Sequence, residues 1–187
     1  MTSIRTVDGR AIGPRGLQTR QLLLEATTAA LAEIGYADVQ VIDVARAAGT
    51  SPATFYQYFR SRDEVVLELA HAAAADFADA IQVPRGDGMV DSNSLAKAVD
   101  SFFSIWPTHG PVLRVVELLA PTDKEFSRAR NDINKSLTAT IARAATGGHA
   151  AGLATAMVAM LSATAAQNPS KKAKALARNL VLESTAA

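Results

Sequence analysis

The sequence predicts an all-α protein, and three observations support this prediction. Alanine, the residue with the highest intrinsic helix propensity, supplies 38 of the 187 residues. Apolar residues recur at steps of three and four along most of the chain, which is the period of an amphipathic helix. No stretch alternates between apolar and polar residues as a half-buried strand does. We therefore expect about nine helices, and no disulfide or thiolate metal site because the chain has no cysteine.

Three helices are expected in the first third of the chain. The first covers residues 18–34 and is followed by Gly35 as a helix stop. Its apolar residues recur at helical steps: Leu22, Leu23, Ala26, Ala29, Ala30 and Ile34. A short helix over residues 41–48 ends before Gly49. A third, over residues 52–58, opens with Ser51 as N-cap and Pro52 in the first helical position.

The remaining helices belong to a larger second part. Ser61-Arg62-Asp63-Glu64 fits a capping box that opens a helix running to about residue 83. Residues 85–93, rich in Gly, Asp and Ser, form the expected linker. Five further helices are expected over residues 94–106, 112–120, 123–145, 149–167 and 170–184. Pro107, Gly110 and Pro111 separate the first two of these five.

The stretch from residue 41 to residue 59 fits a helix-turn-helix. Two short helices that cross steeply need a small residue at the crossing, a residue that turns sharply and apolar anchors on the inward faces. Ala45 and Gly49 fulfil the first two needs, and the anchors are Val44, Ala48, Phe55 and Phe59. The outward side chains of the second helix would then face a DNA major groove.

Residues 19–69 resemble the DNA-binding region of the TetR family of transcriptional regulators. The residues that carry the resemblance are Glu33-Ile34-Gly35-Tyr36, Asp43-Val44-Ala45, Ala48-Gly49, Ser51, Thr54-Phe55-Tyr56, Tyr58-Phe59 and Ser61-Arg62-Asp63-Glu64. The resemblance implies a DNA-binding domain (18–62) and a helical ligand-binding and dimerisation domain (63–187). The arginines, glycines and proline before them indicate a flexible basic arm (1–17). The resemblance also implies a homodimeric repressor that a small-molecule effector releases from a palindromic DNA operator.

The candidate DNA-binding residues surround the second helix of the motif: Thr50, Ser51, Ala53, Thr54, Tyr56, Gln57, Tyr58 and Arg62. By resemblance, Tyr56 and Arg62 hold phosphates, and a glutamine amide such as that of Gln57 can pair with adenine. The alternatives are that the tyrosine rings pack on the first helix and that Arg62 is a surface residue without a role. Where the family commonly has a hydroxyl at the start of the preceding helix, this chain has Val39-Gln40-Val41.

The net charge of +1 excludes a strongly basic nucleic-acid protein, but the charges are unevenly placed. Residues 1–62 carry seven arginines and five acidic residues, whereas residues 63–187 carry twelve basic and thirteen acidic residues. The first 20 residues hold four arginines and one acidic residue. A flexible arm of this kind can enter a minor groove, with Arg10, Arg15 and Arg20 as candidates. The alternative is a tail that serves solubility.

Candidate ligand contacts are aromatic and polar residues of the middle helices: Phe102, Phe103, Trp106, His109, Glu117, Phe126 and Met157. The low charge of residues 94–120 favours an apolar or amphipathic ligand. The alternative is that these residues form ordinary core.

A dimer interface is expected in the last two helices. Residues 144–170 carry no Asp, Glu, Lys or Arg. They are mostly small, which favours close helix packing over a membrane span. The candidate interface residues are Leu153, Met157, Met160, Leu161, Thr164, Leu176, Leu180 and Val181. The alternative is core within one subunit. Without a secretory signal or a span, we expect a cytoplasmic protein with no membrane partner.

Enzyme functions find no support in the sequence. His71, His109 and His149 lie far apart without metal-ligand spacing, and neither a nucleophile–base pair nor a phosphate-binding loop is recognisable. We expect no catalytic residue, metal or cofactor. The rival hypothesis is a helical module that binds a small molecule or a protein and carries a vestigial DNA-binding head.

Overall fold

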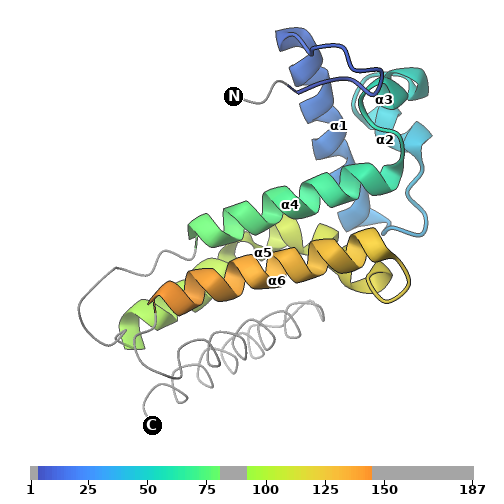
Figure 1. The fold of residues 1–187 in the computed structure, drawn as a ribbon. Coiled ribbons are helices and arrows are strands. Elements are labelled where there is room, and N and C mark those ends of the chain that lie inside the picture. The colour runs from blue at the N-terminus through green and yellow to red at the C-terminus, as the bar shows by residue number, and fades with distance from the viewer. Residues whose placement is uncertain (1–3, 81–91, 145–187) are drawn as a thin grey trace. The chain divides into compact units, whose positions relative to one another are not determined.

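A computed structural model describes residues 4–80 and 92–144, and it confirms the all-α class. Its six helices are α1 (Pro14–Glu33), α2 (Val41–Ala47), α3 (Pro52–Tyr58), α4 (Arg62–Ala80), α5 (Ser92–Leu119) and α6 (Lys124–Ala144) (Figure 1). The chain divides into two compact units, Met1–Leu69 and Ala70–Ala187. We call the first unit the head. The helices expected over 149–167 and 170–184 lie outside the described residues, as do the end of the helix near residue 83 and most of the linker.

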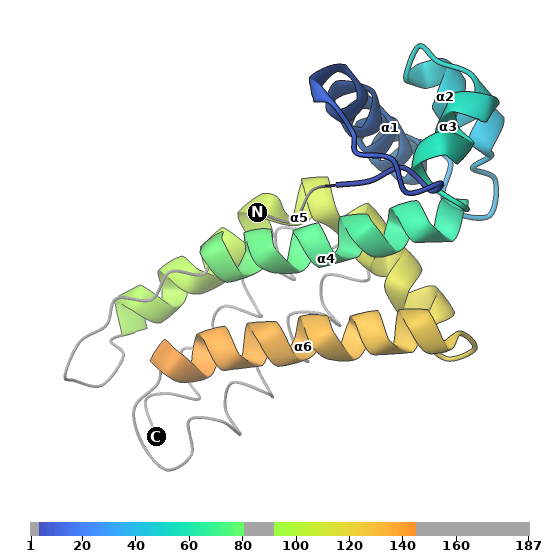
Figure 2. The ribbon, with the colours of Figure 1, turned by 45° about the horizontal axis from the view of Figure 1, so that its top comes forward.

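The second unit contains the end of α4 together with α5 and α6 (Figure 2). The carboxylate of Asp123 accepts the backbone N–H groups of Glu125 and Phe126 at 2.7 and 3.1 Å and so caps the start of α6. The buried side chains of α6 recur at steps of three and four: Phe126, Ala129, Ile133 and Leu137. This stripe places α6 on the core and agrees with the helix expected over 123–145.

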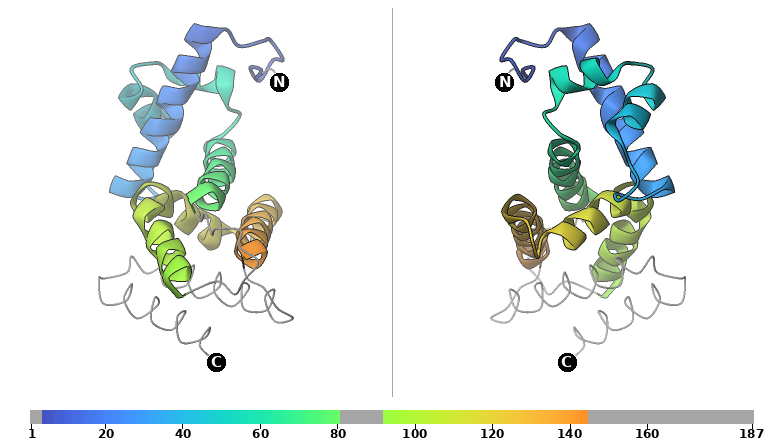
Figure 3. Two further views of the ribbon diagram at one scale, coloured as in Figure 1. Left: turned by 90° about the vertical axis from the view of Figure 1, so that its left-hand side faces the viewer. Right: turned by 90° about the vertical axis from the view of Figure 1, so that its right-hand side faces the viewer.

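Helix α5 runs through Pro107 and Pro111, so the expected division into helices 94–106 and 112–120 is wrong. Each proline lacks an N–H, and an interior proline costs a helix about 3 kcal/mol or more. Burial offsets this cost, because a fully buried apolar side chain contributes roughly 1.5–3 kcal/mol. Six large apolar side chains of α5 are buried: Phe103, Trp106, Val112, Leu113, Val115 and Val116. The ribbon of α5 changes direction along its course (Figure 3), as helices do at prolines.

An aromatic cluster joins α5 to the end of α4. The ring centroid of Phe77 lies 6.1 Å from that of Trp106 and 5.7 Å from that of His109. His109 Nε2 also lies 3.1 Å from a carboxylate oxygen of Asp76. The Trp106 indole lies directly against Gly110, where an added Cβ would come within 2.5 Å of Nε1. This close contact explains why a glycine is tolerated inside α5.

Helix α1 begins at Pro14, four residues earlier than expected, because proline fits the first helical position, where no N–H is needed. Residues 14–17 therefore belong to α1 and not to an arm. The buried stripe of α1 is Leu23, Thr27 and Leu31. Leu22 and Ile34, expected on the same apolar face, are 43% and 46% exposed. The helix ends before Gly35, whose φ of +78° favours glycine as predicted.

Helices α2 and α3 form the expected helix-turn-helix. Ala45, at the crossing, is fully buried, and Gly49 turns the chain with φ +67°. Ser51 caps α3 as predicted, since its hydroxyl accepts the N–H of Thr54 at 3.2 Å. Phe55 and Phe59 are at most 1% exposed. Their burial fixes which face of α3 points away from the core.

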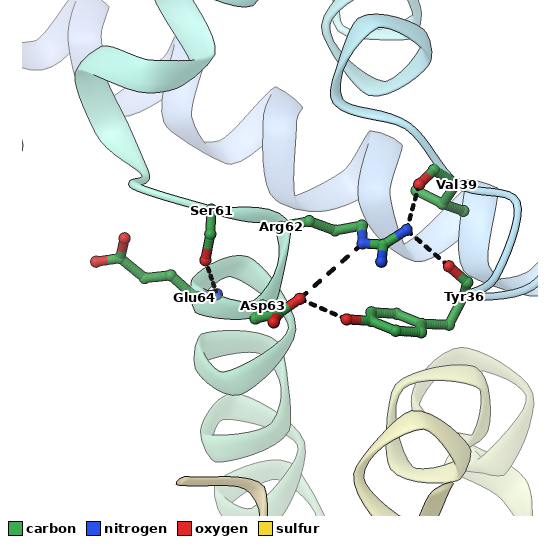
Figure 4. A network of polar contacts seen from close by, with 6 residues as sticks. All are labelled: Tyr36, Val39, Ser61, Arg62, Asp63 and Glu64. Carbon is green, nitrogen blue, oxygen red and sulfur yellow. Dashed lines mark hydrogen bonds and ion pairs between the residues drawn. The ribbon is translucent and has the colours of Figure 1, made fainter. Parts of the chain in front are cut away.

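Polar contacts fasten the start of α4 to the connection between α1 and α2 (Figure 4). Arg62 Nη1 donates to the backbone oxygens of Tyr36, at 2.8 Å, and Val39. The guanidinium carbon of Arg62 lies 3.9 Å from the centroid of the Tyr36 ring, and the Tyr36 hydroxyl donates to Asp63. Ser61 caps α4 through the N–H of Glu64 at 3.2 Å. The Glu64 carboxylate returns to the N–H of Arg60 rather than to that of Ser61, a variant of the expected capping box.

A second attachment joins α4 to α1. Both terminal nitrogens of Arg20 donate to the two carboxylate oxygens of Glu68, and the guanidinium lies 4.7 Å from the centroid of the Phe59 ring. The side chain of Arg20 is 14% exposed. Arg20 therefore lies within α1 rather than in an arm, and its contact with DNA stays a prediction.

We predict that Gly110→Ala lowers the free energy of unfolding by about 1–3 kcal/mol, the usual cost of overpacking. Alanine is the better helix former by about 1 kcal/mol, so the clash with Trp106 has to exceed this gain. Trp106 is the single tryptophan, and its fluorescence during urea unfolding reports directly on this site. Ser104→Ala, at an exposed position of the same helix, is the control. Unchanged or increased stability of the Gly110 variant would contradict the packing described.

A second prediction concerns alkaline pH. Burial and the hydrogen bond to Asp63 raise the pKa of Tyr36 above its ordinary value of 10.0. A raised folded-state pKa gives stability that is complete below pH 10 and is lost as the pH rises through the folded-state value. We expect Tyr36→Phe to be less stable than the wild type at neutral pH and to lose less stability above pH 10. Urea unfolding between pH 8 and pH 11 measures both, with Tyr56→Phe as the hydroxyl-deletion control. Parallel pH profiles for Tyr36→Phe and the wild type would rule out this role of Tyr36.

Candidate nucleic-acid interface

The outward face of α3 presents neutral polar and small side chains. Ala53, Tyr56 and Gln57 are exposed, and Tyr56 retains 52% of its accessible surface. The Ser51 and Thr54 hydroxyls lie 3.0 Å apart beside the start of the helix. This face has hydrogen-bonding groups suited to base edges and phosphates, and the buried Phe55 and Phe59 hold it outward.

Tyr58 and Thr50 are partly buried, as are Thr54 and Arg62 of the predicted set. Tyr58 is partly buried, and its hydroxyl oxygen would be 3.1 Å from a Cβ at Gly16, so its ring packs on the start of α1. This is the alternative that the sequence left open. Thr50 is also partly buried, and its N–H donates to the Ala45 oxygen at 2.8 Å. Within this motif, the structure therefore favours Tyr56 over Tyr58 as a residue that meets a partner.

Arg62 is a structural residue of the head. Its side chain is 28% exposed, and the contacts to Tyr36 and Val39 engage Nη1 and one face of the guanidinium. The sequence suggested either a phosphate clamp or a surface arginine, and it did not reveal the attachment to the α1–α2 connection. The sequence could not reveal this attachment because the acceptors are backbone oxygens, which every residue carries.

An open hollow of about 530 Å³ lies beside Tyr56. Its lining is largely apolar and comes from both helices of the motif and from the start of α4: Val39, Gln40, Val41, Ile42, Pro52, Tyr56 and Arg62. Ile42 is 49% exposed. The region that lacks the family hydroxyl at the start of α2 is therefore an apolar rim next to the recognition helix.

The predicted arm is folded from residue 4 onward. Arg5 and Ala11 form an antiparallel bridge, and Gly9, at φ +87°, turns the chain between them. Asp8 lies 2.7 Å from Arg10, and the Thr6 hydroxyl also donates to it. The hydrogen bond from Thr6, aided by the Arg10 charge, lowers the pKa of Asp8. The Asp8-Gly9 pair is a hairpin signal that could have revealed this turn from sequence.

The candidate ligand residues divide into core and surface. Phe103, Trp106 and Phe126 are at most 6% exposed and are part of the helical core. His109 pairs with Asp76, and exposed Glu117 lies 3.9 Å from Arg130. The side chain of Phe102 and all of Met157 lie outside the described part of the structure. So do the predicted dimer residues Leu153, Met160, Leu161, Thr164, Leu176, Leu180 and Val181.

Membrane-spanning helices and metal-binding clusters are both absent from residues 4–80 and 92–144. No helix there is both long and apolar enough to cross a lipid bilayer. Within the same ranges, His, Asp and Glu residues do not gather in a group of three or more that could hold a metal ion.

Comparison with known proteins places both units in one family. Residues 23–69 match the family of bacterial regulatory proteins called the tetR family, and residues 79–183 match the tetracyclin repressor-like C-terminal domain. The regulator EthR of Mycolicibacterium smegmatis is 30% identical over 130 residues, 65% of this chain and 58% of that protein. The fatty acid metabolism regulator protein of Bacillus subtilis is 24% identical over 114 residues, 60% of this chain and 59% of that protein. The chain thus matches about three fifths of the length of these relatives.

Solved structures share the fold. A tetR-family regulator from Streptomyces coelicolor has a TM-score of 0.73 at 18% identity, over 91% of this chain and 79% of that one. The fatty acid degradation regulator FadR from Bacillus halodurans has a TM-score of 0.68 at 20% identity, over 92% and 97% of the two chains. Since the matched family models cover the helix-turn-helix and most of the second unit, this chain belongs to the TetR family of bacterial transcriptional regulators.

Proposed function

We propose that this chain is a homodimeric repressor that a small effector releases from a palindromic operator. The exposed face of α3 carries this proposal, because a buried core holds it outward on a helix-turn-helix. Residues 50, 51, 53, 54, 56 and 57 would meet the operator, with Tyr56 on a phosphate and Gln57 on a base edge. The main role of Tyr58 and Arg62 would be to position this face of α3, and not to contact DNA.

A dimer is required by the way such motifs read DNA. Two recognition helices reach successive major grooves only when they lie about one helical turn apart, roughly 34 Å. Two-fold symmetry of the protein then matches a palindromic site. We place the subunit contact in the last two predicted helices. A regulator that binds chromosomal DNA would act in the cytoplasm.

The proposed effector is apolar or amphipathic and binds in the second unit. The described candidates there are mostly buried apolar side chains, and the two polar ones, His109 and Glu117, pair with Asp76 and Arg130. Side chains of this kind suit a ligand with a long apolar part and a polar group. Two relatives are named as regulators of fatty acid metabolism or degradation, which makes fatty acids the first compounds to test.

The rival function is a helical binding module whose head no longer binds DNA. The apolar rim at Val39 and Val41 and the modest charge of the head favour this second possibility. The two functions differ in their response to salt, since phosphate contacts release counterions from DNA.

We predict a steep fall of DNA affinity with salt. For a duplex of mixed sequence, the slope of log K against log salt concentration is about −0.9 for each phosphate contact. Fluorescence anisotropy at several salt concentrations measures the slope. A slope near zero, or no binding at low salt, would support the rival function.

We further predict that Tyr56→Phe weakens DNA binding without loss of fold. Removing one hydrogen bond to phosphate from each head costs about 1 kcal/mol per head, or about thirtyfold in affinity for a dimer. Tyr58→Phe is the matched control, because that hydroxyl lies against α1. Circular dichroism confirms the fold of both variants. Equal affinity of Tyr56→Phe and the wild type, or equal losses in the two variants, would argue against the assignment of Tyr56.

A further inference from the structure

The head has few cations to offer DNA. Residues 4–69 contain seven arginines, no lysine and eight acidic residues. Proteins bind the DNA backbone largely by neutralising phosphates with basic side chains. The position of each arginine therefore decides where the backbone can be held.

Two of the seven arginines are held at partly buried positions, and a third pairs with a neighbour on its own helix. Arg20 is paired with Glu68, and Arg62 is bound to backbone oxygens and lies on the Tyr36 ring. Arg46 lies 3.3 Å from Asp43 on the exposed side of α2. Of the four others, Arg60 follows α3, whereas Arg5, Arg10 and Arg15 lie within eleven residues of one another near the N-terminus. All four are exposed.

Hydrogen bonds fold residues 4–12 into a hairpin, which we call the N-terminal hairpin. The Thr6 N–H donates to the Arg10 oxygen at 2.9 Å, and the Gly9 N–H donates to the Thr6 oxygen at 2.9 Å. Arg5 Nη1 donates to the Gly9 oxygen at 2.7 Å and so stabilises the turn. Among the described residues, no carboxylate forms an ion pair with Arg5. Arg10, with a side chain 84% exposed, is partly neutralised by Asp8.

The N-terminal hairpin is docked on the recognition helix. The Val7 N–H donates to the Gln57 backbone oxygen at 2.9 Å. Gln57 is the second-last residue of α3, so this oxygen is one of the last four that have no donor within the helix. Gly16 permits a close approach on the other side, where an added Cβ would lie 2.7 Å from Ile12 Cγ2. The dark blue segment accordingly lies beside α3 in Figures 1 and 2.

We propose that the N-terminal hairpin, together with Arg15 at the start of α1, is a preformed element that binds the DNA backbone beside the groove read by α3. It supplies most of the phosphate contacts of the head. The inference rests on the proposed function and adds a second contact region to it. Because the hairpin is bonded to Gln57, its arginines keep a fixed position relative to the recognition helix. This fixed position lowers the entropy lost on binding compared with that of a free arm.

The charge test compares two triple variants. R5Q/R10Q/R15Q removes the proposed contacts, and K124Q/R128Q/K135Q removes three exposed positive charges from α6. Both are titrated by anisotropy against a fluorescein-labelled duplex of mixed sequence at several salt concentrations. A dimer loses six arginines in the first variant, so its slope of log K against log salt concentration should become shallower by about five.

The outcomes separate the inference from the proposed function. If R5Q/R10Q/R15Q and the α6 variant have the same slope while the slope of the wild type is steep, the inference is overturned. The proposed function is then unaffected. If the wild type shows no salt-dependent binding, the proposed function itself is overturned.

Asp8→Asn provides an independent check that removes none of the proposed arginine–phosphate contacts. It takes away the negative charge beside Arg10 and should raise the affinity for the same duplex, and an unchanged or lower affinity counts against the inference.

The docking test uses the Val7 N–H. Val7→Pro removes this donor. Val7→Ala keeps the donor and, like Val7→Pro, removes the branched valine side chain. If the hairpin acts from its docked position, Val7→Pro should bind the duplex about tenfold more weakly than Val7→Ala. Equal affinities would show that the arginines act as a free tail and would overturn the preformed element. Urea unfolding of both variants shows whether the head itself is intact.

Discussion

The attachment of α4 to the head is the interaction on which the other features depend. Arg62 and Asp63 hold the α1–α2 connection, and Glu68 holds Arg20 on α1. Charged groups at partly buried positions are costly to separate, because the remaining partner keeps an uncompensated charge. The first turns of α4 are thus part of the head, and the same helix continues to Ala80 in the second unit.

This attachment also decides the electrostatics of the proposed interface. Arg20 and Arg62 stabilise the head and are therefore poorly placed to neutralise phosphates. In the proposed interface, the two tasks of a DNA-binding surface fall to different segments. Neutral polar side chains on α3 are suited to reading bases, whereas the exposed arginines of the N-terminal hairpin are suited to holding the backbone. The bond from Val7 to Gln57 keeps the two segments in one arrangement.

In the second unit, the described aromatic residues mainly form the packed core. Trp106 lies against Phe77 of α4 and against Gly110 of its own helix, at the position that a Cβ would take. His109 and Asp76 add one polar pair between the same helices. Of the proposed effector contacts, Trp106 and His109 lie against α4.

Local chemistry in the sequence determined the class, the family and most helix ends. Ser51, Gly35 and Gly49 mark helix ends through contacts within a few residues, so their effects are readable without a structure. The tertiary structure alone decided the course of α5, the roles of Arg20 and Arg62, the packing of Tyr58 and the docking of the N-terminal hairpin. The physical reason is distance along the chain. Arg20 and Glu68 are 48 residues apart, and no local pattern records a partner that only folding brings within hydrogen-bonding reach.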